Sequence, residues 1–141
     1  MECKVSWVPQ SGMAMLAESG SGHAVVMDVA PDSGGRNVGV RPMEMLLMGT
    51  AGCTTFDVVH ILKKGRHDVR GCQVRIEADR ADTEPKVFVR LNMHFTVTGK
   101  GLSPEVVERA IHLSHEKYCS ASIMMAKTAQ ITTSFEVVDA G

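Results

Sequence analysis

The sequence lacks a dominant charge, internal repeats and low-complexity segments. Its 141 residues contain 15 Lys and Arg against 16 Asp and Glu, which gives a formal net charge of −1. The basic residues are scattered, so nothing favours nucleic acid or an anionic membrane as a partner. The length suits one hydrophobic core, and no linker interrupts the chain. We therefore expect a single domain spanning residues 1–141.

A signal-peptide pattern is also missing, because Met1-Glu2-Cys3-Lys4 is polar and no apolar run follows it. The longest apolar-rich stretch, 43–62, is about long enough to span a bilayer. However, Glu44, Asp57 and His60 interrupt it, and such groups are costly in hydrocarbon. We expect a buried helix in a cytoplasmic protein that does not bind membranes.

The cysteines do not follow a metal-binding spacing. There are four of them, Cys3, Cys53, Cys72 and Cys119, and none belongs to a C-x-x-C pair. This pattern gives little support to a zinc site, and no metal or cofactor is expected. In a reducing compartment the thiols should stay reduced, so that any disulfide is catalytic rather than structural.

Hydrophobic periodicity and turn residues predict strands, then a long helix, two strands, two helices and a last strand. The helix should begin at Pro42 and end at Gly65, and a second helix should begin after Ser103 as its N-cap. The expected strands are 4–8, 13–18, 24–29, 73–78, 87–97 and 130–138, a glycine-rich loop covers 30–40, and a short helix covers 121–127. This order is typical of an α+β domain in which antiparallel sheets wrap around a buried central helix. The first helix is apolar on most sides, which is a weak indication of a dimer.

Local sequence leaves the roles of Cys53 and Cys119 open. A cysteine in a buried helix is usually an inert small hydrophobe. However, small residues precede Cys53 and leave room for a substrate, and two threonines follow it. Cys119 lies where one helix ends and the next begins, where a helix N-terminus favours the thiolate. Inert and reactive thiols are both compatible with these surroundings.

The segments 39–53 and 114–120 make the sequence resemble the OsmC/Ohr family, most closely its YhfA-like branch. Residues 39–53, GVRPMEMLLMGTAGC, resemble the family's central-helix motif, with a proline, a first-turn glutamate, small residues and the reactive cysteine. Residues 114–120, SHEKYCS, resemble the segment of the second cysteine. The order of elements matches over nearly the whole chain. The resemblance implies the OsmC-like fold as an intertwined homodimer with pockets at the subunit interface.

The resemblance also implies a thiol-dependent peroxidase of organic hydroperoxides. Cys53 would be the peroxidatic thiolate and would become a sulfenic acid. Cys119 would resolve it as a disulfide, which a small dithiol or a lipoyl protein would reduce. Family members stabilise the thiolate with an arginine that a glutamate holds.

Arg36, in the glycine-rich loop, is the first candidate for this arginine and Arg41 is the second. Glu44 is the candidate glutamate, but it lies nine residues before Cys53 and could only act through the arginine. The better-known reductases have their glutamate one place earlier, where this chain has Met43. A first-turn glutamate also has a simpler use, since it favours the helix dipole.

Other interpretations remain at this point. Cys53, Asp57 and His60 share a helix face, but His60 would lie about 10 Å from Cys53 along the axis, too far for cysteine–histidine acyl chemistry. Asp57 should instead pair with a cation or cap a neighbouring segment. The same two cysteines would also serve a non-catalytic redox sensor or a small-molecule binding protein on the same fold. A structural interaction protein with unreactive thiols is the third hypothesis.

Overall fold

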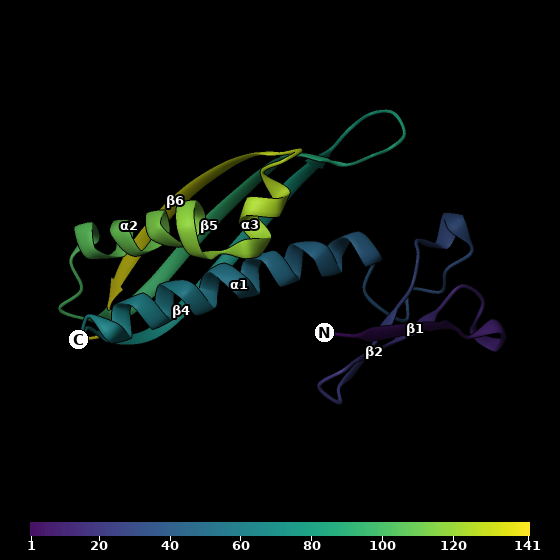
Figure 1. Cartoon of the computed structure of the whole chain (residues 1–141), viewed down its shortest axis with the longest axis horizontal. Helices are drawn as coiled ribbons and strands as arrows, with labels where there is room; N and C mark the ends of the chain where they lie inside the picture. The colour runs from purple at the N-terminus through teal and green to yellow at the C-terminus, as the bar shows by residue number, and fades with distance from the viewer. The chain divides into compact units, whose positions relative to one another are not determined.

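The computed structural model describes all residues, 1–141, as two compact units. The first unit is Met1–Leu47 and the second is Met48–Gly141. Figure 1 shows the elements of both, and each unit is described by itself.

The first unit contains a meander of three short antiparallel strands, as the sequence predicts. The strands are β1 (Cys3–Trp7), β2 (Met15–Ser19) and β3 (Ala24–Met27), in the order β1-β2-β3. Short 3-10 turns, η1 (Pro9–Ser11) and η2 (Pro31–Ser33), follow β1 and β3. The expected loop then leads into α1 (Pro42–Lys64), which begins and ends where the sequence predicts.

A glutamate closes the N-terminus of α1. The Glu44 carboxylate accepts a hydrogen bond from the backbone N–H of Arg41, at 2.8 Å. This contact pairs a backbone donor that the helix leaves without a partner, and it places negative charge at the positive end of the helix dipole.

By length and composition alone, α1 is also apolar enough to cross a membrane.

The second unit consists of a three-stranded sheet, the rest of α1 and two further helices (Figure 1). The sheet order is β4-β5-β6, with β4 (Asp68–Arg80), β5 (Phe88–Lys100) and β6 (Gln130–Asp139). Between β5 and β6 lie α2 (Pro104–Leu113), the π-helical turn η3 (Ser114–Tyr118) and α3 (Ser120–Met125). As predicted, Ser103 caps α2, because its hydroxyl accepts from the N–H of Val106.

The expectation that every strand pair is antiparallel is wrong for β6. This strand runs parallel to β5, from Arg90 opposite Gln130 to Gly99 opposite Asp139. A parallel neighbour requires a crossover, and the α2–η3–α3 segment supplies it. This crossover matters for the site, because it carries Cys119 over one face of the sheet.

The core of the second unit lies between that face and two helices. Phe95 on β5 packs in one cluster with Val58 and Leu62 of α1 and with Val107 of α2. All four side chains are fully buried. The opposite side of α1 is not covered in the single chain, where Phe56 is 65% exposed. Within the single chain, α1 is therefore buried on one side and exposed on the other.

Candidate active site at a cysteine pair

Cys53 is held by the part of α1 that packs on the sheet. Thr54 and Val58, which flank it along the helix, are buried, whereas Cys53 itself is partly exposed. A methyl group added at Gly49, one turn before Cys53, would meet nothing within 4 Å. The helix therefore keeps the thiol in place, and the small residue beside it leaves open space.

Cys119 is positioned by the end of the π-helical turn. Such turns interrupt a helix and are frequent at functional sites. The backbone of Cys119 is extended (φ −78°, ψ 96°), and α3 begins at the next residue. Its Sγ accepts hydrogen bonds from the backbone N–H of Ser122, at 3.3 Å, and from the Ser122 hydroxyl, at 3.1 Å. Cys119 is fully buried.

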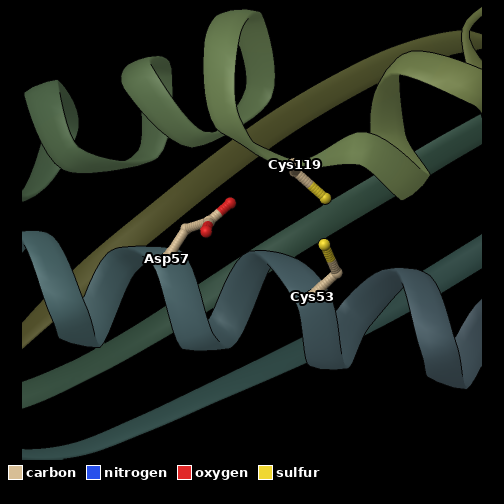
Figure 2. Close-up of side chains that lie close together, drawn as sticks. All are labelled: Cys53, Asp57 and Cys119. Atoms are coloured by element: carbon tan, nitrogen blue, oxygen red, sulfur yellow. The ribbon is translucent and has the colours of Figure 1, made fainter.

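The two sulfur atoms face one another between α1 and the start of α3 (Figure 2). The Sγ atoms of Cys53 and Cys119 and a carboxylate oxygen of Asp57 all lie within 4.8 Å of one another. Both cysteines are free thiols. At this distance, side-chain rotation and a small shift would bring the sulfurs to bonding distance. The fold thus joins two cysteines that are 66 positions apart in the chain.

Asp57 ends a buried chain of hydrogen bonds beside the thiols. The Ser114 hydroxyl donates to Asp57 Oδ2, at 2.9 Å, and lies 2.8 Å from the hydroxyl of Thr54. Asp57 is only 9% exposed, yet no lysine, arginine or histidine forms an ion pair with it. Neither use expected for Asp57 is observed, since no cation pairs with it and it accepts from a serine hydroxyl of the neighbouring segment instead of capping that segment's backbone. His60 instead stacks on Phe56, with ring centroids 5.3 Å apart.

The surroundings of Cys119 favour its protonated form. Burial raises the pKa of the Cys119 thiol, and the neighbouring Cys53 raises it further. The two hydrogen bonds from Ser122 lower this pKa and offset part of the effect. The net pKa is above the ordinary value, so Cys119 is a thiol at neutral pH. Burial also raises the pKa of Cys72, which lies inside β4 and packs against the core.

Arg36, Arg41 and Glu44 belong to the first unit. The Arg41 guanidinium donates to Asn37 Oδ1, at 3.1 Å, and to the carbonyl of Gly39, at 3.2 Å. Arg36 is exposed and its side chain lies beside Gly12. Glu44 binds the backbone of Arg41 rather than a guanidinium, which is the simpler use considered for it.

Asp28 organises the loop that carries Arg36 and was missed by sequence reasoning. Its side chain is fully buried and accepts from the backbone N–H groups of Val29, Arg36 and Val38. These bonds, with that of Arg36 contributing most, hold the pKa of Asp28 below its usual value. An aspartate before a Pro-Asp-Ser-Gly-Gly loop was the available signal, because aspartate side chains commonly pair loop backbone groups.

A cavity of about 440 Å³ adjoins the cysteine pair through Asp57. Its lining combines the apolar or aromatic side chains of Phe56, Ile61, Leu113 and Tyr118 with the polar ones of Asp57, His60 and Lys64. Such a mixture of apolar walls and few polar groups is typical of small-molecule sites.

Three comparisons place this geometry among known proteins. The family profile described as "OsmC-like protein" matches residues 33–134. Protein YhfA of Escherichia coli (strain K12) is 46% identical over 140 residues, which cover 99% of this chain and 100% of that protein. A crystal structure of a hypothetical protein from Aquifex aeolicus VF5 superposes with a TM-score of 0.84 at 26% identity, over 99% of this chain and 97% of that one. An organic hydroperoxide resistance protein OsmC from Legionella pneumophila shares the fold, with a TM-score of 0.69 and 16% identity over 96% of this chain and 97% of that one.

Proposed function

Because the chain belongs to the OsmC-like family, we propose that it is a thiol-dependent peroxidase that reduces organic hydroperoxides with Cys53 and Cys119. The observation that carries this proposal is the pairing of the two thiols, whose sulfur atoms lie within 4.8 Å of one another. The Legionella protein with the same fold is named for organic hydroperoxide resistance, which supports the choice of substrate class.

The exposure of the two cysteines supports their order in the reaction. Cys53 is partly exposed and can meet a hydroperoxide, whereas Cys119 is fully buried beside it. In the first step the Cys53 thiolate attacks the terminal oxygen of R–O–O–H. The O–O bond breaks, the departing alkoxide takes up a proton from water and leaves as the alcohol, and Cys53 becomes a sulfenic acid.

In the second step Cys119 attacks the sulfenic sulfur. The S–S bond forms, the S–O bond breaks, and water leaves with the Cys119 proton. A small dithiol or a lipoyl protein then reduces the disulfide by exchange and is itself oxidised to a disulfide. The raised pKa of the Cys119 thiol keeps it protonated until the sulfenic acid forms, so that it does not compete for the peroxide.

The apolar cavity beside Asp57 favours organic over inorganic peroxide. Phe56, Ile61 and Leu113 would bury the R group of an alkyl or aryl hydroperoxide, and hydrogen peroxide has no such group. Activation of Cys53 by Arg36, with Arg41 as the alternative and Glu44 as the group that holds it, remains part of the proposal.

The proposal also includes a cytoplasmic homodimer. Three large apolar side chains of α1 are at least 46% exposed in the single chain, namely Leu46, Met48 and Phe56. A second copy of the chain would cover them, and light scattering after gel filtration would give twice the chain mass. The mass of a single chain would contradict this part.

The test of the activity is peroxide consumption by the reduced protein with dihydrolipoamide. We expect many turnovers, faster with cumene hydroperoxide than with hydrogen peroxide, and a Cys53–Cys119 disulfide in the mass spectrum when the dithiol is left out. Cys53→Ser should abolish consumption. Cys72→Ser is the matched control, because this cysteine lies on β4 and outside the group formed by Cys53, Asp57 and Cys119, and it should keep full activity. Full activity of Cys53→Ser would remove the proposal.

A redox sensor is the second candidate, and Asp57 is the observation that favours it. A carboxylate close to both thiols disfavours a second negative charge and so slows thiolate chemistry. A sensor would form the disulfide once and would not cycle with the dithiol. Disulfide formation without turnover would therefore contradict the proposed enzyme activity and support a sensor.

A further inference from the structure

Cys53, Asp57 and Cys119 form a set of metal-ligand atoms that the spacing of the cysteines does not reveal. Cys53 and Asp57 are one helical turn apart on α1, and Cys119 joins them from the turn before α3 (Figure 2). One thiol sulfur from each cysteine and one carboxylate oxygen lie within 4.8 Å of one another. The set is largely sheltered, since Cys119 is fully buried and Asp57 is 9% exposed.

The distances are close to those of a tetrahedral zinc site. Zinc binds thiolate sulfur at about 2.3 Å and carboxylate oxygen at about 2.0 to 2.2 Å, so its ligand atoms lie roughly 3.3 to 3.8 Å apart. The three atoms here would each have to move by about 1 Å or less. Rotation about side-chain bonds supplies such shifts without a change in the backbone.

Two serines already hold the ligands from behind. The Ser114 hydroxyl donates to Asp57 Oδ2, which orients the carboxylate. The N–H and hydroxyl of Ser122 both donate to Cys119 Sγ, an arrangement that stabilises a thiolate. Hydrogen bonds of this kind orient metal ligands and tune their basicity.

The charge of the cluster also calls for a cation. A buried carboxylate normally has a cationic partner, yet no ion pair includes Asp57. Two thiolates and one carboxylate carry three negative charges, and a divalent ion would leave a net charge of only −1. Thiolate sulfur selects zinc over magnesium or calcium, and the carboxylate disfavours Cu(I).

We propose that the reduced protein binds one Zn²⁺ ion through Cys53 Sγ, Cys119 Sγ and one oxygen of Asp57, with the fourth position open to water. Binding releases the two thiol protons and transfers no electrons. Oxidation of the same sulfurs to a disulfide removes two ligands and releases the ion. Zinc binding and thiol oxidation therefore exclude each other. The inference does not depend on peroxidase activity, because it concerns the reduced pair alone.

The test is a titration of reduced, metal-free protein with Zn²⁺ against a chromophoric chelator, without oxygen. We expect one equivalent to bind. With Co²⁺ as the probe, a sulfur-to-cobalt charge-transfer band should appear in the near ultraviolet. Cys53→Ser and Cys119→Ser should each weaken binding by at least about 100-fold, and Asp57→Asn by about 10- to 100-fold. The disulfide form should bind no ion.

Cys3→Ser and Cys72→Ser are the matched controls and should leave the zinc affinity unchanged. Cys53 is partly exposed, so Cys53→Ser should fold. The test therefore stays valid even if Asp57→Asn, which changes a buried side chain, does not fold. Absence of binding to the reduced wild-type protein, or equal binding by Cys53→Ser, would overturn the inference. Zinc binding without peroxide turnover would support the metal site and contradict the proposed peroxidase activity. Each proposal can therefore be refuted without the other.

Discussion

Ser114→Ala tests the buried hydrogen-bond chain beside the cysteine pair. Ser114 is fully buried, and its hydroxyl bonds to Asp57 Oδ2 at 2.9 Å and to the Thr54 hydroxyl at 2.8 Å. A hydrogen bond to a charged group contributes about 1.5 to 3 kcal/mol and a neutral one about 0.5 to 1.5 kcal/mol. The variant leaves two buried polar atoms without this partner. We expect the free energy of unfolding to fall by about 2 to 4 kcal/mol.

Urea unfolding of the reduced protein, at one fixed protein concentration, measures this loss. Ser134→Ala is the matched control, because Ser134 also makes a serine hydrogen bond but on the surface, to His94. It should change the free energy of unfolding by less than about 0.5 kcal/mol. In an Asp57→Asn background the cost of Ser114→Ala should shrink by about 0.5 to 3 kcal/mol, since the two side chains are in contact. Equal costs for Ser114→Ala and Ser134→Ala would refute the reasoning.

Three further predictions address the thiol, the core and the loop. Ser122→Ala removes a hydroxyl donor to Cys119 Sγ and should raise the pKa of that thiol further. Thiolate absorbance measured against pH, in a protein that keeps Cys119 as its only cysteine, would report this pKa. An unchanged or lower pKa would contradict the prediction. Leu62→Ala should lower the free energy of unfolding by about 2 to 5 kcal/mol, because Leu62 is fully buried. Val89→Ala, on an exposed position of β5, should cost much less, and similar costs would contradict the placement of the core. Asp28→Asn should destabilise most at neutral pH, because the lowered pKa of Asp28 means that its ionised form stabilises the fold. The difference from wild type in urea midpoint should begin to shrink as the pH falls below about 4, the unfolded value, and should be smallest once the pH is below the lowered pKa of the folded state. A difference independent of pH would contradict this prediction.

Elements with a strong local signal could be predicted from the sequence. Pro42 and Gly65 mark the ends of α1, and Ser103 caps α2, because these residues act on the backbone next to them. The direction of β6 could not be predicted in this way. Alternating apolar residues are the same in parallel and antiparallel strands, and the path of the crossover decides between them.

In the candidate site, too, some features could be predicted from the sequence and others depend on the fold. Family resemblance singled out Cys53 and Cys119, but only the fold brings their sulfurs within 4.8 Å. Ser114 was quoted as part of a motif without a role, because nothing local shows that its hydroxyl reaches α1, 57 positions earlier. The sequence predicts for Asp57 a cation partner or a capped neighbouring segment, and the lack of a C-x-x-C pair gives little support to a metal site. Both expectations rest on neighbours in the sequence, whereas the hydrogen bond from Ser114 to Asp57 and the nearness of Asp57 to the two sulfurs depend on the fold.

Asp57 links the proposed chemistries through its charge. As a free carboxylate it raises the cost of a thiolate at Cys53, which slows attack on a peroxide. With Zn²⁺ between the three side chains the same carboxylate becomes a ligand, and both sulfurs are deprotonated but occupied. Asp57→Asn should therefore have opposite effects on the two reactions. It should raise the rate of peroxide attack by metal-free protein and weaken zinc binding, and a loss of both, in a variant that folds, would mean that Asp57 acts only on the structure of the site.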